Sequence, residues 1–104
     1  MKTVPEHESI LVRLATEAVR LGADLLEVEY KDGYEEVFAA KGGVGQGIAR
    51  FQSSNPEAAT LREELHRIAR HKQRIAVGGA QYELRGSVYH SFGEDTFRVE
   101  LRRV

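Results

Sequence analysis

The stretch KGGVGQGIAR, residues 41–50, has the glycine content of a loop that binds nucleotide phosphates. Such a loop requires Gly-x-x-x-x-Gly-Lys-Ser/Thr between a strand and a helix, because the lysine contacts the phosphates and the hydroxyl holds magnesium. Gly42 and Gly47 have this spacing, but Ile48 stands at the lysine position and Ala49 at the hydroxyl position. A strand pattern follows, so no helix N-terminus would face a phosphate. The glycines therefore indicate a hairpin and a bulged strand start.

Acid–base chemistry has its best candidates in Glu27 and Glu29, which alternate along a predicted strand and so lie on one face, about 7 Å apart. A small enzyme would use these carboxylates or His90, in a concave pocket with a perturbed titrating group. The competing interpretation is a solvated sheet face on which the glutamates pair with Arg98 and Arg102 of a neighbouring strand. We favour the second interpretation and expect no catalysis.

Metal binding finds little support in the residue types. The chain has no cysteine, which excludes disulfides and thiolate zinc ligands. His66 and His71 are five residues apart, about 140° around a helix, so they cannot hold one ion together. Glu63 and His66 could share a helix face, but no further ligand is evident. We expect neither a metal nor a cofactor.

Basic residues gather near the end of the second predicted helix, where they could contact a nucleic acid backbone. Acidic residues interrupt the cluster and no aromatic residues interleave to stack bases. Part of it also complements the negative end of the helix dipole. Nucleic-acid binding is therefore the alternative rather than the leading hypothesis, and its candidate residues are Arg62, Arg67, Arg70, Lys72 and Arg74.

The first half of the chain must position these residues with one helix and three strands. Apolar residues at three- and four-residue spacing predict a helix over 6–21, capped near Thr3 or Val4 and ended by Gly22. Apolar and charged residues then alternate, which is typical of a half-buried strand, up to the hairpin signal Asp32-Gly33. Two further strands are predicted over about 34–41 and 44–52.

The second half repeats this order. Ser54 or Asn55 can cap a helix that begins at Pro56. A short strand over 74–77 and two longer alternating strands follow. The order αβββαβββ with tight hairpins predicts an α+β fold, an antiparallel sheet of about five to six strands with two helices on one face and a charged opposite face.

The composition indicates a globular protein that forms one domain over residues 1–104. Of its 104 residues, 41% are hydrophobic and 30% charged, and the net charge is −1. No apolar run reaches the roughly 20 residues of a membrane span, and the acidic N-terminus is unlike a signal peptide. We expect a cytoplasmic protein without a membrane span.

Two segments together resemble a known family. LATEAVRLGADLLEVEYKDGYEEVFAAKGGV is similar to the opening of the PAS-like domain that precedes the motor in type II secretion and type IV pilus ATPases. Gly22-Ala23-Asp24 corresponds to a conserved turn of that domain, the strand Leu26–Glu29 follows it, and Gly42-Gly43-Val44 corresponds to the end of a later strand. Downstream, Gly93-Glu94 and the strand Val99–Arg102 match the ending of the same domain.

The resemblance implies a function without catalysis, because no complete phosphate loop accompanies the domain. In the family this domain packs on the motor and contributes arginines near the nucleotide in the hexamer. The corresponding candidates on the last strands are Arg85, Arg98 and Arg102. We therefore expect an interaction or regulatory module that docks on such an ATPase or on a second copy of itself.

Overall fold

The computed structural model describes residues 9–91 and 93–104. Within them lie two helices and six strands in the predicted order αβββαβββ. Their bounds are α1 (Ile10–Arg20), β1 (Leu25–Lys31), β2 (Tyr34–Lys41), β3 (Val44–Gln52), α2 (Pro56–Arg70), β4 (Gln73–Val77), β5 (Ala80–Ser91) and β6 (Glu94–Arg103).

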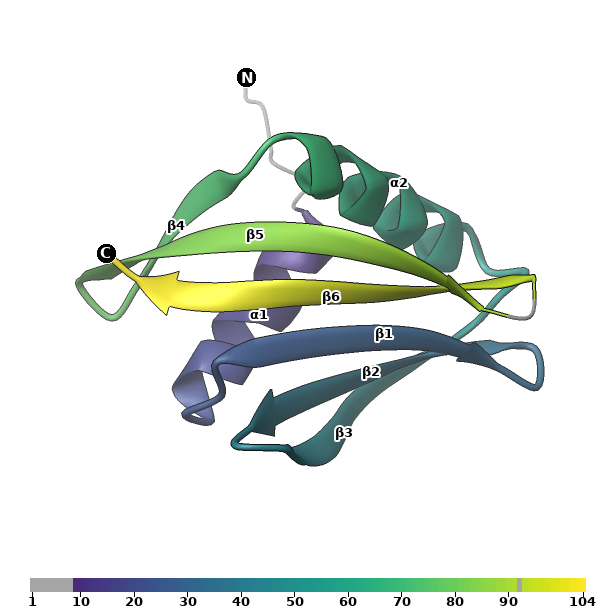
Figure 1. Cartoon of the computed structure of the whole chain (residues 1–104), viewed down its shortest axis with the longest axis horizontal. Helices are drawn as coiled ribbons and strands as arrows, with labels where there is room; N and C mark the ends of the chain where they lie inside the picture. Colours follow the sequence, from purple (N-terminus) through teal and green to yellow (C-terminus); the bar gives the residue numbers. More distant parts are fainter. Residues whose placement is uncertain (1–8, 92) are drawn as a thin grey trace, which may run out of the picture.

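The strands form one antiparallel sheet in the order β3-β2-β1-β6-β5-β4. Each half of the chain forms a three-stranded meander, and β1 joins β6 where the two meanders meet. Both helices lie behind the sheet in the view of Figure 1, so they cover one face and leave the other open. The predicted α+β fold is confirmed. None of the described helices is long and apolar enough to cross a bilayer.

Helix α1 begins later than the predicted 6–21. Ser9 has an extended backbone, and its hydroxyl accepts a hydrogen bond from the N–H of Val12, which makes Ser9 the N-cap. The helix start predicted near residue 6 is therefore wrong, because the serine side chain competes for an amide that a continuing helix would use. The cap expected at Thr3 or Val4 lies outside the described residues. Glu64 of α2 also accepts a hydrogen bond from the N–H of Leu11, so one helix helps to satisfy the first turn of the other.

Helix α2 begins as predicted. The side chain of Asn55 accepts a hydrogen bond from the N–H of Glu57 at 2.8 Å, and Pro56 occupies the first turn. Glu57 lies at the positive end of the helix dipole, while Arg67 and Arg70 lie at the negative end. These local signals fix both ends of the helix that packs across β5.

The glycine-rich stretch connects two antiparallel strands. Gly42 and Gly43 both have positive φ in the turn between β2 and β3. The register then shifts between Val37 and Phe38, which pair with Ala49 and Gly47, so Ile48 is the extra residue of a bulge. The prediction of a hairpin and a bulged strand is confirmed.

The core fills the space between the sheet and the helices. Alternate residues of the strands point into it, with Leu26 and Val28 of β1, Val37 of β2 and Phe97 and Val99 of β6 almost fully buried. One buried cluster contains residues from both helices and from β1, β2, β4, β5 and β6. The side chains on the other face of the same strands are therefore free to meet solvent or a partner.

Candidate functional site

The face of the sheet that the helices leave uncovered is the first candidate site, and we call it the open face. It combines charged residues of both signs with aromatic rings on neighbouring strands. It carries Glu27, Glu29, Tyr34, Glu36, Phe38, Arg50, Glu83, Arg85, Tyr89, Arg98, Glu100 and Arg102. Because acidic and basic side chains are present in similar numbers, the open face is neither an acidic nor a basic patch.

Arg98 lies at the centre of the open face. Its Nε donates to Oε2 of Glu27 on β1 at 2.8 Å, and this bond raises the pKa of the Arg98 guanidinium. The guanidinium carbon also lies 5.3 Å from the ring centroid of Tyr89 on β5. The predicted pairing of Glu27 with Arg98 is confirmed, and Glu27 is therefore committed to an ion pair.

A second guanidinium stacks in the same way near the β3 edge. The guanidinium carbon of Arg50 lies 3.8 Å from the ring centroid of Tyr34, and its Nε lies 3.4 Å from Oε2 of Glu36. Planar arginines over tyrosine rings are partly pre-ordered, which lowers the entropy lost when a partner binds.

Glu83 of β5 is the carboxylate that Arg85 contacts. The Nε of Arg85 donates to Oε1 of Glu83 at 3.0 Å, and Arg102 is the residue directly opposite Glu83 on β6. Nζ of Lys72 lies 3.3 Å from the other oxygen of Glu83. The hydrogen bond from Arg85 is the main reason that the pKa of Glu83 is lowered, and Lys72 adds to it.

Arg85, Arg98 and Arg102 thus lie on one face of adjacent strands. The expected pairing of Arg102 with Glu27 or Glu29 is wrong, because the register places Arg102 beyond the end of β1. Within the described part of the chain, Arg102 forms no ion pair.

The cluster predicted to bind nucleic acid is divided. Arg62 lies in the middle of α2, with its guanidinium on Glu35. Arg70, Lys72 and Arg85 instead line an open pocket of 590 Å³ at the end of α2, beside Gly86. Arg74 on β4 lies opposite Glu83 and is exposed, as is Arg67 on the surface of α2.

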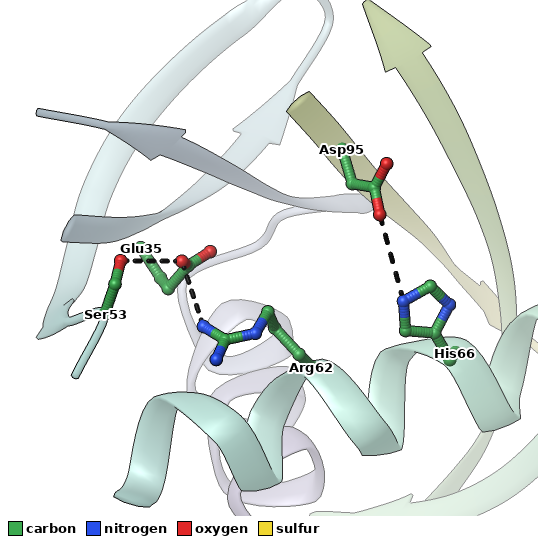
Figure 2. Close-up of polar contacts among 5 residues, drawn as sticks. All are labelled: Glu35, Ser53, Arg62, His66 and Asp95. Carbon is green, nitrogen blue, oxygen red and sulfur yellow. Dashed lines mark hydrogen bonds and ion pairs between the residues drawn. The ribbon is translucent and has the colours of Figure 1, made fainter. Parts of the chain in front are cut away.

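A second polar site lies between α2 and the sheet (Figure 2), and it shares no lining residue with this pocket. Glu35 of β2 is only 4% exposed, yet Oε2 accepts a hydrogen bond from Ser53 at 2.8 Å and another from Arg62 at 3.1 Å. Sequence reasoning missed this group. The signal was strand phase, since Glu35 is two residues before Val37 and four before Ala39 and therefore points to the same buried face.

Two histidines, His66 and His90, lie next to the carboxylate of Asp95. Nε2 of His66 lies 3.9 Å from Oδ2 of Asp95, and Nδ1 of His90 pairs with the other oxygen of Asp95. Among residues 9–91 and 93–104, no group of three or more histidine, aspartate or glutamate side chains is arranged to hold a metal ion.

No protein-family model matches the chain, and a search of curated proteins finds no significant match.

Proposed function

We propose that this protein is a non-catalytic interaction module whose open face binds a protein partner, of the kind that the sequence resemblance implies. The partner is the motor domain of a secretion or pilus ATPase, or a second copy of the chain. The observation that carries the proposal is the gathering of Arg85, Arg98 and Arg102 on one uncovered sheet face.

The composition of the open face supports a protein partner. Arginine and tyrosine are over-represented among the residues that dominate binding energy in protein interfaces. Here Arg98 lies over Tyr89 and Arg50 lies over Tyr34. Charges of both signs also favour one register of docking, because a shifted partner would place like charges against each other.

The test is a binding titration with the motor domain of a type IV pilus ATPase from which its own preceding domain has been removed. A variant that carries Arg85→Gln, Arg98→Gln and Arg102→Gln keeps the polar surface but removes the three charges. Loss of a single hot-spot arginine typically costs about 2 kcal/mol or more, so one hot spot among the three is enough to weaken binding by at least about 30-fold.

The matched control carries Arg13→Gln, Arg20→Gln and Arg67→Gln. These three arginines are exposed on the two helices, on the layer opposite the open face. The control removes the same net charge, so it should bind like the wild type if the open face is the interface. Equal weakening by both triple variants would reject a local interface and leave only a general charge effect.

A second candidate function rests on the basic residues around Glu83. Arg70, Lys72 and Arg85 line the same pocket, and Arg74 and Arg102 lie opposite Glu83 on the flanking strands. This corner of the molecule could contact phosphates of a nucleic acid. Such binding would fall steeply with salt, with a log–log slope near −0.9 for each phosphate contacted. Absent or salt-independent binding to duplex DNA would exclude it.

A further inference from the structure

The cleft around Glu35 is independent of the open face and has the chemistry of a ligand site. It has a volume of 390 Å³ and opens where α2, the start of β2 and the start of β6 come together. Tyr30, Glu35, Ser53, Arg62, Asp95 and Phe97 are among its lining residues. It therefore combines two aromatic rings with carboxylates drawn from two strands.

Both hydrogen bonds that the described residues make to the buried carboxylate reach the same oxygen. Ser53 and Arg62 both donate to Oε2 of Glu35, and neither hydrogen bond uses Oε1 (Figure 2). An ionised carboxylate is costly to bury unless hydrogen bonds satisfy it, and each of its oxygens can accept two. Among the described residues Oε1 of Glu35 accepts no hydrogen bond, which leaves it as an acceptor for a donor in the cleft.

Asp95 supplies a second carboxylate from β6. Its side chain is 33% exposed, and it lies between His66 of α2 and His90 of β5. The ring of His66 meets Phe97 edge-on, with the centroids 5.0 Å apart. Packing against Phe97 keeps the imidazole of His66 in place. The Asp95 carboxylate is therefore positioned by His66 of the helix and by His90 of the sheet.

The charges of the lining select the ligand. Glu35, Glu94 and Asp95 are carboxylates, whereas Arg62 is the one guanidinium in the lining and already contacts Glu35. The excess negative charge favours a cation, and several acceptors near each other suit a group with more than one N–H donor. The rings of Tyr30 and Phe97 suit an apolar stem attached to that cation.

We propose that this cleft binds an alkylammonium or alkylguanidinium group, with the cation between Glu35 and Asp95 and its stem against the aromatic rings. The group belongs either to a free small molecule or to a lysine or arginine side chain of another protein. The proposal does not depend on the open face, so either can fail without the other.

The experiment is an amide NMR titration of the full chain with agmatine and butylammonium, at constant ionic strength. Butyrate and butanol are the matched anionic and neutral probes. At about 10 mM probe, a site with a Kd near 1 mM is almost saturated. We expect saturable shifts at the amides of Ser53 and Asp95 with the two cations and none with butyrate or butanol.

Variants test which carboxylates matter. Glu35→Gln and Asp95→Asn should each weaken cation binding by about tenfold or more, since each removes a charge-assisted hydrogen bond. Asp95 is partly exposed, so its variant keeps the test valid if Glu35→Gln impairs folding. Glu63→Gln is the control, because Glu63 is exposed on α2 and lies outside the cleft; it should bind like the wild type.

A blocked Gly-Arg-Gly peptide distinguishes the two sources of the cation. Binding of the peptide as tightly as agmatine would assign the cleft to a protein side chain, and binding of agmatine alone would assign it to a free small molecule. No shift with either cation, equal shifts with butyrate, or full binding by both Glu35→Gln and Asp95→Asn would overturn the proposal.

Discussion

Helix α2 packs closely on the sheet at Gly86 of β5, and this contact yields the sharpest stability prediction. A Cβ built on Gly86 would lie 2.5 Å from Cγ2 of Ile68 in α2. It would also lie 3.1 Å from the backbone nitrogen of Ala69. A rotamer change of Ile68 could relieve only the first contact, because the second is with the backbone of the helix.

Gly86→Ala must therefore push α2 away from the sheet. Overpacking of this kind typically costs about 1–3 kcal/mol, which for a domain of this size lowers Tm by about 4–8 °C for each kcal/mol. Urea unfolding followed by circular dichroism measures this loss in the free energy of unfolding. We expect a lower midpoint with an unchanged m-value, because the surface exposed on unfolding stays the same.

Gly47→Ala is the control, since Gly47 is also a strand glycine and its φ is not positive. A Cβ there would lie 3.8 Å from Cε1 of Phe38, an ordinary contact. Removing glycine at a compatible position stabilises by about 0.4–1 kcal/mol, so the two variants should differ in sign. A Gly86→Ala protein as stable as the wild type would refute the close packing of α2 on β5.

A double variant tests the same contact from the helix side. Ile68→Ala alone should destabilise by about 2–5 kcal/mol, because it leaves a cavity in the core. Combined with Gly86→Ala it should cost less than the sum of the two, since the new methyl group occupies part of that space. Strict additivity would show that the two residues do not touch.

Three further perturbations follow from individual contacts. Glu35→Gln should lower the free energy of unfolding by about 1–3 kcal/mol in urea unfolding, because it weakens two hydrogen bonds at a buried carboxylate, whereas Glu63→Gln on the exposed side of α2 should change little. Asn55→Ala should cost about 1 kcal/mol through loss of the α2 cap, visible as a lower Tm in calorimetry. Glu83 has a lowered pKa in the folded state, so its contribution is present at neutral pH and is lost as the pH falls below about 4.3. The stability difference between wild type and Glu83→Gln should therefore be largest at pH 7 and vanish in acid; a constant difference would contradict this.

Much of the fold could be predicted because its signals are local. The turn at Asp32-Gly33 depends on residues that tolerate positive φ, and both have it. The α2 cap depends on Asn55 and Pro56, which are adjacent in sequence. The error at the start of α1 is also local, because the prediction places the cap near Thr3 or Val4, whereas Ser9 is the N-cap.

The sites were harder to predict because they join residues that are distant in sequence. Glu35 meets a serine 18 residues away and an arginine 27 residues away, and only the packing of α2 on the sheet brings them together. The sequence predicts one basic cluster on α2, yet Arg62 precedes Arg70 by eight residues, about 12 Å along the helix axis. The middle of α2 therefore contributes Arg62 to the site around Glu35, and its end contributes Arg70 to the pocket beside Gly86.

The most direct test of the proposed interaction is light scattering of the purified chain mixed with the motor domain that lacks its own preceding domain. Binding through the open face predicts a complex whose molar mass corresponds to one copy of the chain for each motor subunit. When the variant Arg85→Gln, Arg98→Gln, Arg102→Gln replaces the wild type, the motor should keep the molar mass that it has alone. Motor and wild-type chain that elute separately with unchanged masses, and a chain that stays monomeric alone, would contradict the account.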